Sequence, residues 1–303
     1  MNREATHRHS PLARTADEDR WIERIRPGLG TLVRIGIGGL PLVEAERSIE
    51  RGFEAIATAH RTLGFHDPES DLSVLNRLPV GQSLTVGHML NDVLRIAQAL
   101  AAETGGEFDV TVADALVAEG LLPSIERRVE SGVSWRDLQW DADGTVRWTR
   151  AGLIDLGGIA KGYAIDRAVA AMRLPAAASW RVEAGGDLRV GGAEPERIVL
   201  AVPDHPLDTQ PCIELQNASL ASSAVDRERP VHRRGVDRRP IDEVGFAAVV
   251  ARECVIADAL TKVVLACGAN ADAVLQRYAA TGYLYSARSG WRTLGATRSG
   301  VNL

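Results

Sequence analysis

The order of strand-like and helix-like segments is the feature of this sequence that most restricts its fold. A β-branched stretch, TLVRIGI from residue 31, precedes a long helical pattern over residues 42–64, and strands and helices then follow in mixed order. Because they do not alternate as regular βαβ units, the sequence predicts an α+β fold. No linker rich in Pro, Ser or Gly divides the middle of the 303 residues, which favours one compact body.

The helical segments follow from apolar periodicity and from their start and stop residues. In the first helix Ile49, Phe53, Ile56 and Leu63 recur at helical spacing and predict a core-facing stripe. Ser70 and Asp71 are candidate caps of a short second helix. Further helices are expected over residues 87–104, 159–174, 257–268 and 272–282. Strands are expected over residues 144–158 as a hairpin-like pair, and over 180–192, 196–204, 247–255 and 283–297.

Composition and charge restrict the location and the partners. The balance of 35 basic against 40 acidic residues gives no general electrostatic reason to bind nucleic acid. Cys212, Cys254 and Cys267 lack CxxC spacing, so they predict neither a disulfide framework nor a zinc ribbon. Residues 1–26 lack an apolar h-region and apolar periodicity, and they predict a loosely attached or disordered tail before a domain over 27–303. We therefore expect a cytoplasmic protein without a membrane-inserted segment.

The segment with the most chemical information is DLGGIAKGYAID, over residues 155–166. Asp155 ends a strand-like stretch, Gly157 and Gly158 allow a ligand to approach the backbone closely, and Lys161 lies on the first helical turn. A helix N-terminus and a lysine favour phosphate, and the carboxylate can accept hydrogen bonds or help to hold a hydrated cation. The segment is therefore a candidate pyrophosphate site, although the same spacing also occurs in plain strand-to-helix turns.

This segment resembles the DLGGIAKGYAVD motif of the ApbE family, the FAD:protein FMN transferases. Other segments resemble the family in the same order along the chain: Leu29-Gly30-Thr31, HDPESDLSVLN from His66, FDVTVADAL, VEAGGDLRVGG, ASLASSAVDRER and IADALTKVVLACG. The likeness extends from about Leu29 to Gly268. Agreement in order over this length is far more specific than any single motif.

The resemblance implies a set of site residues. Leu29, His66, Glu107, Phe108, Asp109, Asp155 and Lys161 would line the FAD site, with Asp155 and Lys161 also taking part in the reaction. A magnesium ion would be held by the carbonyl of Gly158 and the carboxylate of Asp258, with Thr261 as a further candidate ligand; hard oxygen donors of this kind suit a small divalent cation.

The reaction that the resemblance implies is metal-dependent transfer of FMN from FAD to a threonine or serine hydroxyl of an acceptor protein, with AMP as the other product. Two other functions remain open from the residues. One is a protein that binds FAD without catalysis after the loss of its metal site. The other is a pyrophosphatase that hydrolyses FAD to FMN and AMP.

Three positions differ from the family pattern. The family has threonine four residues after the aspartate that corresponds to Asp258, and this chain has Lys262 there, with Thr261 about a quarter turn away. The Lys262 ammonium either replaces a cation against the pyrophosphate or extends into solvent. His66 replaces a tyrosine. The family's HIIDPRTG loop is not recognisable in VHRRGVDRRPIDEVG. This basic stretch either contacts the adenylate or forms a solvated face, and we expect the solvated face.

Overall fold

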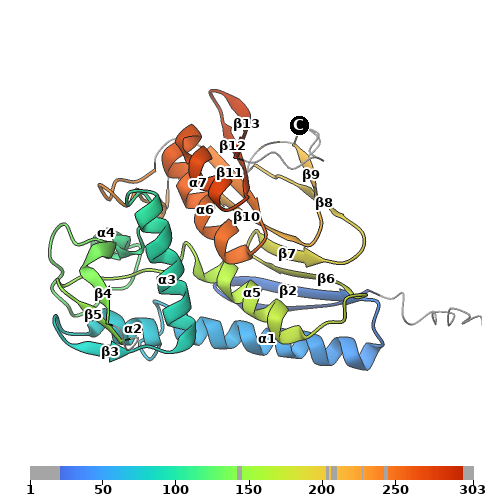
Figure 1. Cartoon of the computed structure of the whole chain (residues 1–303), viewed down its shortest axis with the longest axis horizontal. Helices are drawn as coiled ribbons and strands as arrows, with labels where there is room; N and C mark the ends of the chain where they lie inside the picture. The colour runs from blue at the N-terminus through green and yellow to red at the C-terminus, as the bar shows by residue number, and fades with distance from the viewer. Residues whose placement is uncertain are drawn as a thin grey trace, which may run out of the picture.

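The computed structural model describes residues 21–141, 145–202, 205, 210–226, 228–241 and 245–295. Within these residues the chain forms a mixture of helices and antiparallel sheets, as the sequence predicts for an α+β fold. The elements separate into a large sheet covered by helices and a smaller group of short strands and helices at one end (Figure 1).

The large sheet has eight strands in the order β1-β2-β6-β7-β10-β11-β12-β13. All neighbouring strands in it pair antiparallel. The strands are β1 (Ile22–Gly28), β2 (Thr31–Gly38), β6 (Ser179–Ala184), β7 (Asp187–Gly191), β10 (Ala218–Ala224), β11 (Gly245–Ala251), β12 (Thr281–Ser286) and β13 (Gly290–Gly295).

Three long helices lie along one face of this sheet: α1 (Leu42–Leu63), α5 (Ala160–Met172) and α6 (Cys254–Cys267) (Figure 1). The predicted stripe of α1 is confirmed, because Ile49, Phe53, Ile56 and Leu63 are all buried. One cluster of buried residues joins α1 and α5 to β2 and β6. The close approach of α5 to α6 depends on Gly162, where a Cβ atom would lie 2.2 Å from the Cys254 carbonyl oxygen.

The smaller group of elements contains two of the predicted helices. These are α2 (Asp71–Arg77), with Ser70 as its N-cap, and α3 (His88–Glu103). It also contains β3 (Ser83–Thr85), β4 (Leu138–Trp140) and β5 (Thr145–Trp148), which form a three-stranded sheet, together with α4 (Ala113–Ala118) and the 3₁₀ turns η1 (Val110–Val112) and η2 (Trp135–Asp137). A second apolar cluster joins these elements to α6 and β11.

The remaining elements complete the molecule around the large sheet. A third apolar cluster joins β7, β10 and β11 to the two-stranded sheet of β8 (Glu196–Val199) and β9 (Cys212–Leu215). The 3₁₀ turn η4 (Gly268–Ala271) leads from α6 into α7 (Asp272–Arg277), which confirms the second of the two predicted C-terminal helices. The predicted last hairpin is β12 and β13.

The start of the folded domain differs from the predicted start at residue 27. Residues 22–26 of the expected tail belong to β1, and residues 1–20 lie outside the described residues. The apolar pattern of the sequence does not predict this strand, because Ile22 is its one buried apolar residue. Its polar side chains reach α1 instead: Arg26 pairs with Glu50 and its guanidinium lies 4.4 Å from the centre of the Phe53 ring.

The predicted hairpin over residues 144–158 is half wrong. Its first strand is β5, but residues 151–156 form no strand. The Asn76 side chain takes the place of a neighbouring strand, since its Oδ1 accepts from the Ile154 amide at 2.8 Å and its Nδ2 donates to the Ile154 carbonyl at 2.9 Å. The Asp155 amide then donates to the Val110 carbonyl. An apolar run whose backbone hydrogen bonds are made in this way has the same sequence pattern as a strand.

One helical stretch, Cys254–Arg277, is long and apolar enough by composition to span a membrane. More than half of its apolar window is buried within the protein. Because α6 packs against α5, β10 and β11, its composition is that of a core helix.

Candidate functional site

A cavity of about 420 Å³ is lined by residues of the β1–β2 turn of the large sheet, of α1 and of the smaller group of elements. Its wall contains the β1–β2 turn at Leu29 and Gly30, the end of α1 with the following residues to His66, residues 107–110, residues 155–161 and residues 229–233. These segments are far apart in the sequence. Each residue that the resemblance assigns to FAD lies in this one wall: Leu29, His66, Glu107, Phe108, Asp109, Asp155 and Lys161.

The β1–β2 turn brings a strained residue to the cavity. Leu29 and Gly30 are the two residues between paired Gly28 and Thr31, and their φ angles are 54° and 73°. Two positive φ angles match the twist of a two-residue hairpin, but the left-handed conformation costs a leucine about 1–2 kcal/mol. Strain of this kind at a cavity wall is typical of a position that contacts a ligand.

The double-glycine turn carries Lys161 into the cavity. Gly157 and Gly158 both line the cavity, and α5 begins two residues later at Ala160. The Gly157 amide donates to Asp155 Oδ1 at 3.1 Å, which holds the carboxylate against the turn. Lys161 follows on the first helical turn, as the sequence predicts.

Lys161 meets two buried carboxylates behind the cavity wall. Its ammonium donates to Asp187 at the start of β7, and it lies 3.5 Å from both carboxylate oxygens of Asp258 on α6. The side chains of Asp187 and Asp258 are fully buried. Asp258 Oδ2 also accepts from the Gly162 amide at 3.1 Å. The double-glycine turn and the start of the late helix therefore share one polar centre, as predicted.

Lys262 completes this centre from α6. Its ammonium donates to Asp258 Oδ1 and, at 3.1 Å, to the Asp258 carbonyl oxygen, and its side chain is 14% exposed. Of the two positions that the sequence left open, the structure shows the lysine inside the site and not extended into solvent. Lys161 and Lys262 are the only two lysines among the 35 basic residues of the chain, and both contact Asp258.

The electrostatics of the centre follow from burial and from these pairs. Burial alone would raise the pKa of Asp258, but Lys161 and Lys262 outweigh it and hold this pKa at about 2. Burial and the neighbouring Asp258 charge raise the pKa of Asp187 to about 6, in spite of Lys161. The two lysines thus stabilise the ionised form of Asp258 more than that of Asp187. Burial would lower the pKa of Lys161, but Asp258 and Asp187 raise it instead, so Lys161 is a permanent cation at neutral pH.

The groups expected to hold magnesium do not surround an open position. Thr261 is fully buried, and its hydroxyl donates to the Asp258 carbonyl at 2.7 Å and lies 2.9 Å from Ser223 Oγ. A Cβ atom at Gly158 would lie 3.4 Å from Lys262 Cε, so the lysine side chain passes beside Gly158, the residue whose carbonyl was expected to bind the metal. Within the described part of the chain, no cluster of three or more His, Cys, Asp and Glu side chains is arranged for a metal either.

The basic stretch is packed against the protein, so the expectation of a solvated face is wrong for Arg233, Arg234 and Arg238, whereas the Arg239 side chain is exposed. The Arg233 side chain is 1% exposed and pairs with Glu119. Arg234 pairs with Glu107 in the cavity wall. The charges of Arg233 and Arg234 are therefore neutralised by acidic residues more than a hundred positions earlier in the chain.

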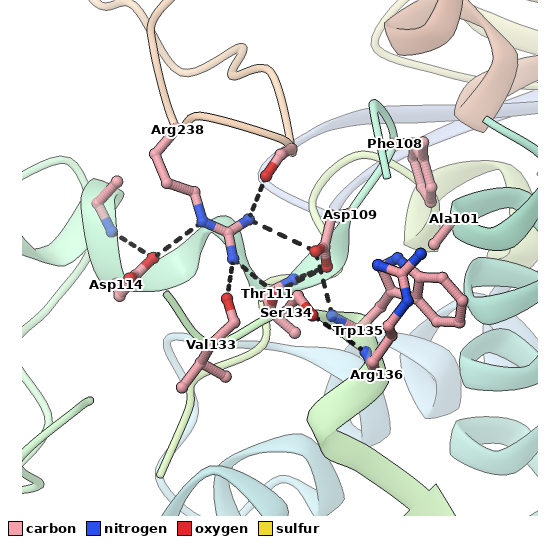
Figure 2. Close-up of polar contacts among 12 residues, drawn as sticks. Ala101, Phe108, Asp109, Thr111, Asp114, Val133, Ser134, Trp135, Arg136 and Arg238 are labelled. Atoms are coloured by element: carbon pink, nitrogen blue, oxygen red, sulfur yellow. Dashed lines mark hydrogen bonds and ion pairs between the residues drawn. The ribbon is translucent and has the colours of Figure 1, made fainter. Parts of the chain in front are cut away.

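Arg238 fixes the same stretch to η1 and to Val133, which lies just before η2 (Figure 2). Its guanidinium donates to Thr111 Oγ1 at 2.8 Å and to the Val133 carbonyl, and it lies 3.6 Å from Asp109 Oδ2. Asp109 Oδ1 accepts from the Thr111 amide and hydroxyl, and Oδ2 accepts from the Trp135 amide at 3.1 Å. Asp109 therefore borders the cavity, but its carboxylate is occupied in holding three segments together.

The other predicted cavity residues differ in their burial and in their contacts. Phe108 is buried, and its amide donates to Thr104 Oγ1 at 3.1 Å, which fixes the backbone after α3. His66 is exposed and makes an edge-to-face contact with Phe65, with 6.3 Å between ring centres. Burial raises the pKa of Asp155, which favours its protonated form more than in water.

Two residues of this site were missed from the sequence. Asp187 belongs to the Gly-Gly-Asp turn, so the motif itself was a usable signal. His232 lines the cavity from the basic stretch, and burial, with Lys262 and Lys161 nearby, lowers its pKa to about 4. A single histidine among arginines gave no signal, because its approach to the lysines depends on the packing of the whole stretch.

Comparisons with known proteins agree with this geometry. The sequence model of the ApbE family matches residues 29–282. Among curated protein sequences, none matches the chain significantly. The crystal structure of the ApbE protein from Thermotoga maritima is 25% identical, with a TM-score of 0.76, and the match covers 90% of this chain and 96% of that one.

Two further solved structures are similar in fold. The flavinyl transferase ApbE of Pseudomonas stutzeri is 20% identical with a TM-score of 0.76, over 94% of this chain and 100% of that one. The flavin transferase ApbE of Vibrio cholerae is 20% identical with a TM-score of 0.78, over 92% and 97%. Because the family model matches the sequence from the β1–β2 turn to the start of β12, over residues 29–282, the chain belongs to the ApbE family.

Proposed function

We propose that this protein binds FAD in the cavity and transfers FMN to a threonine or serine hydroxyl of an acceptor protein, with release of AMP. The observation that carries the proposal is that all seven residues assigned to FAD by the resemblance line one cavity. At its floor, Lys161 and Lys262 present two ammonium groups held by buried carboxylates. Fixed positive charge of this kind suits the pyrophosphate of a dinucleotide.

In the proposed reaction the acceptor oxygen attacks the phosphorus of the FMN half. A new oxygen–phosphorus bond forms, the bond from that phosphorus to the bridging oxygen breaks, and AMP leaves with the bridging oxygen and its electron pair. Lys161 neutralises charge on the phosphoryl oxygens as the bond breaks. The resemblance implies a magnesium ion at Gly158 and Asp258. Because the Lys262 side chain lies beside Gly158 and its ammonium contacts Asp258, no step of this reaction is assigned to a metal.

Asp155 is our candidate for the group that accepts the hydroxyl proton. Three carboxylates line the cavity, Glu107, Asp109 and Asp155. Glu107 pairs with Arg234, and Asp109 is occupied by Thr111, Trp135 and Arg238. Asp155 has no arginine partner within the described residues and accepts a hydrogen bond from Gly157. Its raised pKa makes it a stronger base than an ordinary aspartate.

The test is an incubation of the purified protein with FAD and a flavin-acceptor domain, in chelator and in several divalent metals. We expect covalent FMN on the acceptor, seen by mass spectrometry, and an equal amount of AMP. An acceptor whose target hydroxyl is replaced by alanine should gain no flavin. FMN and AMP formed without any acceptor would instead identify an FAD pyrophosphatase, and FAD bound without turnover in every condition would identify a non-catalytic binding protein.

The location and partners are part of the same proposal. The three cysteines are free thiols, and Cys254 is buried, which suits a reducing compartment. We therefore place the reaction in the cytoplasm, with FAD and an acceptor protein as the partners.

A further inference from the structure

Lys262 occupies the place where the family resemblance puts a divalent cation. Its aliphatic chain lies beside Gly158 and its ammonium ends on Asp258, which are the two residues that would hold the metal. The other candidate ligand, Thr261, is turned into the protein interior toward Ser223. A magnesium ion needs near-octahedral oxygen ligands at about 2.1 Å, and an ammonium group supplies no lone pair.

The ammonium is positioned to contact a phosphate oxygen. An ammonium group has three N–H donors, and within the described part of the chain Lys262 uses two of them, on Asp258 Oδ1 and on the Asp258 carbonyl. Lys262 also lines the cavity, as Gly158 and Lys161 do. The remaining donor can therefore point toward a ligand held over the double-glycine turn.

The local charge balance is complete without a metal. Asp187 and Asp258 carry two negative charges when ionised, and Lys161 and Lys262 carry two positive charges. A divalent cation at Asp258 would lie beside two ammonium groups in a buried region, where repulsion is screened little by solvent. It could bind only after Lys262 had left Asp258.

We propose that the Lys262 ammonium replaces the divalent cation, so that this protein holds the FAD pyrophosphate and its developing charge without a metal. The inference rests on FAD being the ligand of the cavity, as in the proposed function. Lysine is an established phosphate ligand as a point charge, and here Asp258 fixes its position as a carboxylate would fix a metal.

The first experiment measures FAD binding by isothermal titration calorimetry, using full-length protein stripped of metal with chelator. The dissociation constant should be the same in chelator and in millimolar magnesium. Electron paramagnetic resonance of Mn²⁺ should show only the free ion when wild-type protein, FAD and Mn²⁺ are mixed. FAD binding that requires magnesium, or Mn²⁺ bound together with FAD, would overturn the inference.

Two variants at position 262 make the test specific. Lys262→Thr places a hydroxyl one helical turn from Asp258, on the same face as its carboxylate. We expect its FAD affinity in chelator to fall about tenfold or more, since a charge-assisted contact is lost, and to recover with magnesium. Lys262→Met keeps the chain length without a donor or an oxygen ligand, so its affinity should fall equally and not recover. Recovery in both variants, or in neither, would contradict the replacement of a metal by Lys262.

The outcomes separate this inference from the proposed function. Arg239→Ala, at a side chain that is 81% exposed, serves as the control and should bind FAD like the wild type. If FAD binds without metal but no FMN reaches an acceptor, the transfer reaction is wrong while the role of Lys262 stands. If FAD binds and reacts only with magnesium, the transfer reaction stands and the role of Lys262 is wrong. No FAD binding in any condition would overturn both.

Discussion

At the scale of single residues, the site is an arrangement of buried charges whose partners come from distant parts of the chain. Asp258 is contacted by one lysine from its own helix and one from α5. Because an unpaired buried charge is far more costly than a paired one, the two lysines and two carboxylates hold one another in place before any ligand arrives. The polar floor of the cavity is therefore preorganised for an anion.

His232 gives this region a dependence on pH. Its pKa in the folded protein is about 4, against an ordinary value of 6.5, because of burial first and of the nearby lysines second. Between these two values the unfolded chain binds a proton that the folded protein does not bind. The free energy of unfolding should therefore rise with pH over this window, and His232 should contribute no further change above it.

Urea unfolding at several pH values measures this contribution. Relative to the wild type, His232→Gln should remove a slope of at most about 1.4 kcal/mol per pH unit between these two values. The exposed His88→Gln is the matched control and should keep the wild-type slope. Equal slopes for His232→Gln and the wild type would show that this histidine is not held in its neutral form.

The residues of the site were predictable where they belong to a motif and not where they depend on long-range packing. Lys161 and Asp258 lie in segments that carry their own sequence signals, and the structure brings them together as predicted. The roles of Arg234 and Arg238 depend on carboxylates more than a hundred residues away. In a basic stretch read by itself, such pairs cannot be told from solvated charges.

At the scale of elements, the basic stretch of residues 228–241 acts as one wall of the cavity because arginine side chains fasten it. Arg238 contacts η1 and Val133, two residues before η2, at the same time, and Figure 2 shows its guanidinium among Asp109, Asp114 and the Val133 carbonyl. Asp109 is almost fully buried, and burial raises its pKa while Arg238 opposes that rise. The wall and the smaller group of elements therefore depend on one another.

Removal of Arg238 should be costly, and removal of its neighbour should not. Arg238→Ala leaves Asp109 buried without a cation and should lower the free energy of unfolding by about 2–4 kcal/mol. Arg239→Ala, with its side chain 81% exposed, should change it by less than about 0.5 kcal/mol. Chemical denaturation of both variants tests this difference, and equal losses would mean that the guanidinium network does not stabilise the fold.

Helices were predicted more successfully than strands because their signals are local. α1 shows its stripe and α2 its serine cap within the segment itself, and both are confirmed. The strand predicted near Ile154 was wrong because the partner of that backbone is the Asn76 side chain. β1 was missed because its polar side chains are satisfied by α1. Both predictions were wrong because the groups that hydrogen-bond or pair with the segment lie elsewhere in the sequence.

At the scale of the whole molecule, the cavity forms only where several separately packed parts meet. Its wall combines the β1–β2 turn, the end of α1, residues before η1, the start of α5 and the basic stretch. These parts belong to different apolar clusters of the core. A ligand that contacts all of them binds the folded protein alone, so its binding energy adds to the stability of the fold.

FAD should therefore stabilise the entire protein. At a free concentration of about one hundred times its dissociation constant, we expect the free energy of unfolding to rise by about 2.7 kcal/mol. Hydrogen exchange should slow together at the β1–β2 turn, at residues 155–161 and at residues 228–241. AMP or FMN alone should protect fewer of these segments. Protection by FAD confined to one segment would contradict a cavity shared by all of them.

The scarcity of lysine makes the polar centre observable by selective isotope labelling. Since Lys161 and Lys262 are the whole lysine content and both contact Asp258, a chain grown on isotopically enriched lysine carries its side-chain signals only at this centre. Nuclear magnetic resonance of those two ammonium groups would report directly whether a ligand is bound at the centre and whether the lysines are charged. No other side chain of the protein would carry the label.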